Sequence, residues 1–187
     1  MVSKASIVTN YKCSGPDERL DIIFTNFPNF IGIVDGYTEG LVHLIASERS
    51  YNRRNRNGNP GIRIQSSSNS DITSDTACEN VMIRDSLKAC NLTEDILADT
   101  DLEDSIRFEK DMLTLQMMRR EYDVVKAQMN ALNKDERFVL REYFSEGKDI
   151  TAIADEVGIA YESARQRIRR AKRKLKSYVI PFMREQI

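Results

Sequence analysis

Apolar residues recur at helical spacing along most of the chain, and no strand-like alternation competes with that pattern. The longest example predicts a helix over about 102–131. One row of apolar positions has spacings of three and four residues: Phe108, Met112, Leu115, Met118, Tyr122, Val125, Met129 and Leu132. A second row lies beside it: Ile106, Leu113, Met117 and Val124. The two adjacent rows predict that a broad face of this helix is buried. That burial fits packing against the chain's own helices, and it equally fits a coiled-coil seam of a homodimer through 106–132.

Four further helices are predicted ahead of the two helices of the helix-turn-helix, from the same spacing and from helix start and stop signals. The first begins at Gly15 and Pro16 and ends near residue 26. The next two are expected over about 31–53 and 75–90. The fourth, over about 134–145, begins behind Asn133 with Glu136 three residues later, which is the spacing of a capping box.

The predicted helix over 31–53 carries three glycines at intervals of four residues, Gly32, Gly36 and Gly40. Each glycine costs a helix about 1 kcal/mol relative to alanine. The glycines therefore either weaken this helix or mark a place where another helix packs closely against it.

The C-terminal region has the pattern of a helix-turn-helix. Its first short helix carries apolar residues on one face, at Ile150, Ile153, Ala154 and Val157. Gly158 then occupies the turn, where a residue without a Cβ adopts a positive φ at no steric cost. The second helix has an apolar stripe at Ala164, Ile168, Ala171 and Leu175, which leaves its opposite face available for a partner.

Together these segments predict an all-α protein with four parts. Residues 1–53 form an N-terminal helical region, and 54–75 form a polar linker rich in Asn, Ser, Arg and Gly. Residues 76–129 form a helical, coiled-coil-like region. Residues 130–187 form the helix-turn-helix domain, with a core small enough to be only marginally stable by itself.

Charge is distributed unevenly, although the formal net charge is only −1. Residues 160–187 hold nine Lys or Arg against two Asp or Glu, whereas the rest of the chain holds 19 against 27. An acidic body with one basic helix is expected to be repelled by DNA everywhere except at that helix. The basic side chains that would contact phosphate are these: Arg167, Arg170, Lys172, Arg173 and Lys176.

Composition argues against several other classes of protein. No apolar run is long enough to cross a bilayer, and no signal peptide is recognisable, so a cytoplasmic protein is expected. Three cysteines without C-x-x-C spacing and a single histidine suggest neither a disulfide framework nor a metal site. No nucleophile–base pair or glycine-rich phosphate loop is present, so we expect neither an enzyme nor a cofactor.

The landmarks of the C-terminal region resemble a known family. Glu136-Arg137, Glu146-Gly147, Ile153-Ala154 and Gly158 fall in the order found in the C-terminal domain of bacterial sigma factors, region four, which reads the minus-35 promoter element. The resemblance implies a DNA-binding domain that makes base contacts from the start of its second helix. The matching positions are Tyr161, Glu162, Arg165, Gln166 and Arg169. Arg suits guanine, Glu suits the amino group of cytosine, and Gln suits either an acceptor or a donor.

A looser resemblance spans about residues 60–176 and points to phage-encoded regulators of the ArpU kind. Both resemblances imply a transcriptional regulator that binds double-stranded DNA, with RNA polymerase as a possible second partner. One alternative is a divergent sigma factor acting with core polymerase, although the chain has no Trp for the strand-opening work of such a protein. Another alternative is a phage DNA-packaging protein similar to a small terminase subunit.

Overall fold

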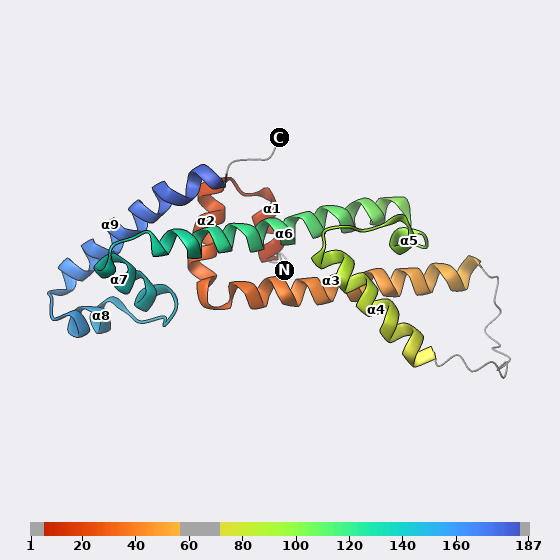
Figure 1. Ribbon diagram of the computed structural model, residues 1–187, viewed down its shortest axis with the longest axis horizontal. Coiled ribbons are helices and arrows are strands. Elements are labelled where there is room, and N and C mark those ends of the chain that lie inside the picture. Colours follow the sequence, from red (N-terminus) through yellow and green to blue (C-terminus); the bar gives the residue numbers. More distant parts are fainter. Residues whose placement is uncertain (1–5, 57–71, 184–187) are drawn as a thin grey trace, which may run out of the picture. The chain divides into compact units, whose positions relative to one another are not determined.

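The structure is a computed structural model that describes residues 6–56 and 72–183 (Figure 1). These residues form α-helices and two short 3₁₀ turns, without any strand, which confirms the all-α class. The α-helices are α1 (Ile7–Cys13), α2 (Pro16–Asn26), α3 (Phe30–Arg56), α4 (Ile72–Lys88), α5 (Glu94–Leu97), α6 (Leu102–Asn130), α7 (Lys134–Phe144), α8 (Ile150–Val157) and α9 (Tyr161–Val179). The turns are η1 (Phe27–Asn29) and η2 (Ile180–Phe182).

The long helices lie where the apolar spacing placed them, but two short helices were not predicted. The helix α1 begins at Ser6, whose side chain accepts a hydrogen bond from the backbone N–H of Thr9. The helix α5 is a single turn that begins behind Thr93. Helices of one or two turns show little periodicity, so neither produced a recognisable pattern. Most of the linker expected over 54–75 lies outside the described residues.

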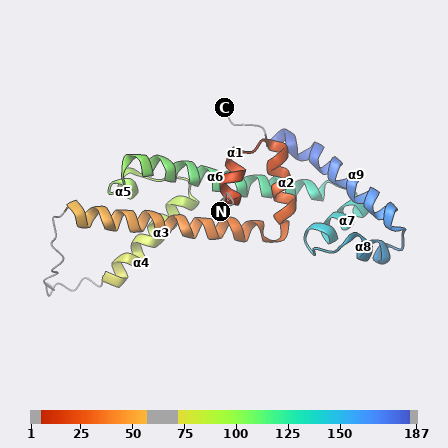
Figure 2. The same ribbon diagram turned by 180° about the vertical axis from the view of Figure 1, so that it is seen from behind.

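The chain divides into two compact units, and their boundaries fall inside α3 and α6. The first unit joins Met1–Val34 to Met117–Ile187, and the second comprises Asp35–Gln116. The start of the chain thus shares a unit with the helix-turn-helix segment. In both ribbon views α1 and α2 lie beside the C-terminal part of α6 (Figures 1 and 2).

Aromatic side chains fill the core of the first unit. The rings of Phe30 and Tyr122 stack with centroids 5.4 Å apart, and Phe27 lies 5.1 Å from Tyr122. Phe24 of α2 stacks on Phe144 of α7 at 4.6 Å. Because the fully buried Leu20 and Ile23 belong to the same helix as Phe24, α2 supplies the unit with a whole apolar face.

A buried ion pair joins α2 to α6 inside this core. Arg19 donates to both carboxylate oxygens of Glu121, at 3.0 and 2.9 Å, and each side chain is only 6% exposed. Arg19 also donates to the backbone carbonyls of Ser14 at 3.1 Å and Met183 at 2.6 Å. Tyr11 donates its hydroxyl to Glu121, and its pKa is raised by burial and by the neighbouring carboxylate. The network therefore connects α1, α2, α6 and the residue that follows η2.

The second unit is built from α3, α4, α5 and the N-terminal part of α6. Its core includes Leu41, Ile45, Ile83 and Phe108, all at most 5% exposed. Ion pairs surround this core. Arg84 of α4 donates to both carboxylate oxygens of Glu39 at 2.7 Å, and Arg53 contacts Glu79 at 2.6 Å and Asp99 at 2.7 Å.

The long apolar row of α6 and the residue Leu132 are buried within the chain. None of the eight residues from Phe108 to Leu132 is more than 9% exposed. This burial supports the alternative in which the row packs against the chain's own helices. In the second row, by contrast, Ile106 is 44% and Leu113 is 55% exposed. Among the described residues, no helix is both long and apolar enough to cross a membrane.

We expect Glu121→Ala to reduce the free energy of unfolding by about 3–5 kcal/mol, because it leaves the Arg19 guanidinium buried without its counter-ion. Replacing the whole network by apolar residues in Tyr11→Phe/Arg19→Met/Glu121→Leu should recover most of that loss. Urea unfolding followed by far-ultraviolet circular dichroism measures both. A loss below about 1 kcal/mol for Glu121→Ala would show that the pair is hydrated and unimportant for stability.

Candidate nucleic-acid interface

Local sequence signals set the ends of the helices that carry the interface. Asn133 accepts from the backbone N–H of Glu136 at 2.8 Å, and the Glu136 carboxylate accepts from the N–H of Asn133, which completes the capping box of α7. Asp149 caps α8 by accepting from the N–H of Ala152 at 2.7 Å. Gly158 then ends α8 with φ of 69°, the left-handed conformation expected at the turn.

A lysine between α7 and α8 fixes the first of the two turns. Lys148 donates to Glu142 of α7 and to Glu156 of α8, both at 2.7 Å. Hydrogen bonds to these two carboxylates raise the pKa of Lys148, so it remains charged throughout the physiological range. This cluster was not predicted, because spacings of six and eight residues across a turn follow no helical period.

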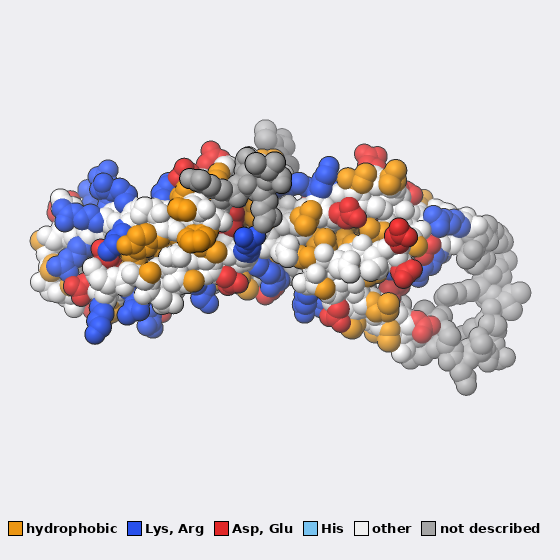
Figure 3. Space-filling view, turned by 45° about the horizontal axis from the view of Figure 1, so that its top comes forward, with side chains coloured by type: hydrophobic (Ala, Val, Ile, Leu, Met, Phe, Trp, Pro, Cys, Tyr) orange, Lys and Arg blue, Asp and Glu red, His pale blue; other side chains and the backbone are white. Residues whose placement is uncertain are grey.

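The helix α9 separates its apolar and basic residues onto opposite faces. Ala164, Ala171 and Leu175 are fully buried and Ile168 is 4% exposed, as the stripe predicted. This stripe faces the inside of the unit, where α7 and α8 both contact α9. Figure 3 shows Lys and Arg side chains gathered at the end of the unit formed by α7, α8 and α9. The packing therefore fixes which face of α9 meets solvent.

The five residues expected to read bases all lie on this exposed face. Tyr161 is 47% exposed at the first position of α9. Glu162 and Arg165 form a surface pair at 3.4 Å, and pairs this exposed contribute at most about 1 kcal/mol. Both side chains can therefore exchange this contact for one with a base. Ala160, at the N-cap position, has no side-chain acceptor for the first N–H groups of α9, which favours an anion at that end.

The five cations expected to contact phosphate fall into two groups. Arg167, Arg170 and Arg173 are exposed. Lys172 and Lys176 are half-buried and already have partners in the protein. The ammonium of Lys172 lies 4.1 Å from the ring centroid of Tyr143, which gives a cation–π contact, and Lys176 pairs with Asp17 at 2.7 Å.

The partner of Lys176 belongs to α2, far away in sequence. The hydrogen bond to Asp17 raises the pKa of Lys176, and the charges of Asp17 and Asp21 act in the same direction. Beside Lys176, an open groove of about 850 Å³ is lined by α2, α7, α9, the start of α8 and the turn between α7 and α8. Its aromatic side chains are Phe24, Tyr143, Phe144 and Tyr161, and its cations are Lys148, Lys172, Arg173 and Lys176. No local pattern in the residues indicated that α2 would border the basic helix.

The geometry of α7, α8 and α9 defines this part of the chain as a helix-turn-helix domain with a basic second helix. Residues 122–175 match the model of the family described as Sigma-70, region 4. The match covers less than half of the chain and includes the end of α6, all of α7 and α8, and most of α9. Sigma-70 region 4 is a non-enzymatic, DNA-binding domain, so the match indicates a sigma-factor-like role in DNA binding for these residues. Comparison with curated proteins and with solved structures gave no match.

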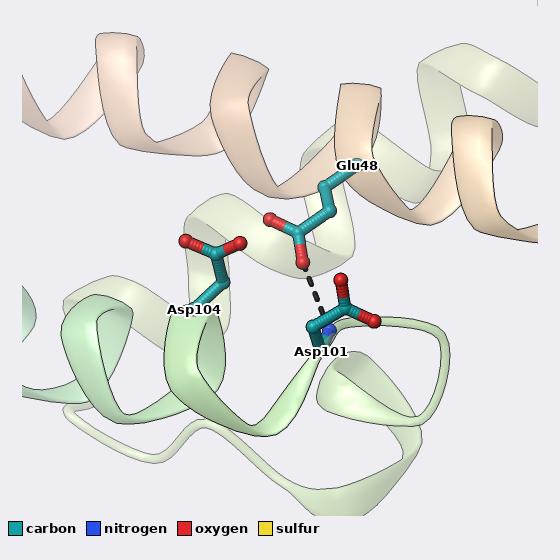
Figure 4. A group of neighbouring side chains, drawn as sticks. All are labelled: Glu48, Asp101 and Asp104. Atoms are coloured by element: carbon teal, nitrogen blue, oxygen red, sulfur yellow. Dashed lines mark hydrogen bonds between the residues drawn. The ribbon is translucent and has the colours of Figure 1, made fainter.

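An acidic cluster in the second unit has a structural role. The carboxylate oxygens of Glu48, Asp101 and Asp104 lie within 4.8 Å of one another (Figure 4). Glu48 accepts from the backbone N–H of Asp101 at 2.9 Å, one residue before α6 begins. Burial raises the pKa of Glu48, and the charges of Asp104 and Asp101 act in the same direction. The bond from Asp101 explains why Glu48 lies here, and the absence of a metal site remains a prediction.

We expect Asp17→Asn to strengthen binding to duplex DNA by up to about fivefold at low salt. Lys176 must break its ion pair with Asp17 before it can contact DNA, and an exposed ion pair contributes at most about 1 kcal/mol. Fluorescence anisotropy with a labelled duplex measures the change. The control is Glu109→Gln, which removes one exposed acid from the second unit and changes the net charge equally. Equal effects of the two substitutions would mean that net charge alone is responsible.

Proposed function

We propose that this protein is a transcriptional regulator, encoded by a phage or prophage, that reads promoter DNA with α9. The observation that carries the proposal is the exposed face of α9 on a domain that matches sigma-70 region 4. Polar residues able to hydrogen-bond base edges occupy the first half of that face, and cations continue along the helix. Phosphate contacts fix the position of a protein on the duplex, and base contacts supply sequence specificity.

The first two turns of α9 supply the base contacts. Arg165 and Gln166 are exposed one after the other, two turns or less from the start of the helix. In helix-turn-helix proteins the N-terminal residues of the recognition helix contact base edges in the major groove. Arg165 is suited to the O6 and N7 acceptors of guanine, and Gln166 to adenine. Glu162 accepts from the amino group of cytosine once its surface pair with Arg165 opens.

The remaining cations supply affinity without sequence information. Arg167, Arg170 and Arg173 meet the phosphate backbone directly, since they are exposed. Lys172 and Lys176 stand at the border with α2 and exchange their internal partners for phosphate. Each neutralised phosphate releases counter-ions, so the affinity falls steeply with salt concentration.

Transcription with purified polymerase tests the proposal and separates it from a divergent sigma factor. A regulator acts only when core polymerase also holds a separate sigma factor. A sigma factor directs promoter-specific initiation with core polymerase alone. Run-off transcription from a template that carries a selected binding site, with and without the housekeeping sigma factor, distinguishes the two. A protein that selects no preferred sequence from random duplexes would overturn both.

We expect Arg165→Ala to weaken binding to the selected site by about tenfold to a hundredfold, because a bidentate base contact contributes about 1–3 kcal/mol. Binding to scrambled duplex should change much less. Arg173→Ala should weaken binding to both duplexes by the same factor and reduce the salt slope by about one. Titrations on both duplexes at several salt concentrations measure these effects, with Lys110→Ala in the second unit as the charge-matched control. Equal losses on the two duplexes for Arg165→Ala would refute its assignment to a base.

A further inference from the structure

The open groove beside α9 combines cations with aromatic rings inside the first unit. From α9 it is lined by Tyr161, Lys172 and Lys176, which follow one another along the helix, and by Arg173. The intervals from Tyr161 to Lys172 and on to Lys176 are close to three turns and one turn, so these three side chains lie on one side of α9. At about 1.5 Å per residue, they span about 22 Å. The groove is therefore an elongated channel along α9 and not a compact cavity.

Two cations of the groove, Lys172 and Arg173, form no ion pair within the described part of the chain. The ammonium of Lys172 instead lies 4.1 Å from the ring centroid of Tyr143 and 4.9 Å from that of Phe144. Arg173 is exposed. An aromatic ring attracts a cation through its quadrupole and carries no net charge, so it does not neutralise the cation. Both positive charges are therefore available to an anion that enters the groove.

The other charges that line the groove are balanced within the chain. Lys148 has its two glutamate partners, and Lys176 has Asp17. The charge of Asp21 also acts on Lys176. The second acid that lines the groove, Asp149, caps α8. The attraction for an anion is thus concentrated at the two cations that have no ion pair.

Three aromatic rings of the groove are accessible from outside. Tyr161 is 47% exposed, and Phe24 and Tyr143 are half-buried. A fourth ring, Phe144, is buried and stacks on Phe24. The bases inside a duplex are covered on both faces by their neighbours, whereas an unpaired base can stack on a protein ring. Rings in such a position therefore favour an unpaired strand over a duplex.

We propose that this groove binds a short unpaired stretch of DNA strand, with bases on its rings and phosphates at Lys172 and Arg173. Proteins that hold single strands combine a positively charged groove with aromatic side chains in this way. A stacked strand advances about 3.4 Å per nucleotide, so a length of about 22 Å accommodates about six nucleotides. A free nucleotide has the same chemistry but leaves most of that length empty. The proposal goes beyond the reading of duplex DNA by α9 and adds a second mode of binding.

The first test uses the full chain and a fluorescein-labelled oligothymidylate of about twelve nucleotides, which forms no duplex. Fluorescence anisotropy should show binding that saturates in the micromolar range. Thr25 is exposed and lines the groove from α2. Thr25→Glu should weaken this binding at least about tenfold, because its carboxylate repels phosphate, and should change duplex binding less than about twofold. The matched control, Gln116→Glu, adds the same charge at an exposed position of the second unit and should alter neither.

A second test detects stacking itself. The fluorescence of a 2-aminopurine base in the oligonucleotide is quenched when that base stacks on an aromatic ring. Tyr161→Phe keeps the ring and should keep the quenching. Tyr161→Leu should lose most of the quenching and weaken binding to the strand by about tenfold. Contact through charge alone would give no quenching and equal affinities for the two variants, which would overturn the proposal. Circular dichroism confirms that all variants remain helical.

The remaining outcomes separate the groove from other sites. Strand binding that Thr25→Glu leaves intact, or that Gln116→Glu weakens equally, would place the strand elsewhere and overturn the proposal. Saturation by adenosine or thymidine monophosphate in the same concentration range would overturn it in favour of a free nucleotide. Duplex binding is measured on the same samples. A protein that binds duplex but no single strand refutes the groove alone, and one that binds single strand but no duplex refutes the reading of duplex by α9 alone.

Discussion

The buried pair of Arg19 and Glu121 is the constraint on which the first unit depends. Two charges removed from water are tolerated only when every polar group around them has a partner. Here the guanidinium donates to Glu121, Ser14 and Met183, and the carboxylate also accepts from Tyr11. These contacts join residues from both ends of the chain to Glu121 of α6. They make the N-terminal helices part of the domain that carries α9, rather than a separate region joined to it by a linker.

This arrangement decides what surrounds α9. Because α2 is anchored at Arg19, its acidic side chain Asp17 reaches Lys176, and its ring at Phe24 covers Phe144. The basic face of α9 is consequently divided. Its first half is exposed and polar. Its second half borders α2 and α7, where Lys176 pairs with Asp17 and the ammonium of Lys172 lies over the ring of Tyr143. In the function we propose, specificity and affinity therefore arise from different parts of one helix.

In the second unit, too, ion pairs influence which surfaces are exposed. Its ion pairs, such as Arg84 with Glu39, lie between α3 and α4 and hold charged groups away from the opposite face of α3. That face of α3 carries apolar and small residues. The long apolar row of α6, by contrast, is buried in the core.

The sequence by itself determined the features that depend on nearby residues. Periodicity fixed the long helices, the capping box at Asn133 and Glu136 fixed the start of α7, and the need for a positive φ fixed Gly158 at the turn. The exposed face of α9 followed from its apolar stripe, and with it the placement of Arg165 and Gln166.

Only the tertiary structure showed that the row from Phe108 to Leu132 is internal, because periodicity indicates that a face is buried and not which element covers it. It alone paired Arg19 with Glu121 and Asp17 with Lys176, since contacts between residues more than 100 positions apart depend on how the helices pack and leave no local pattern in the sequence.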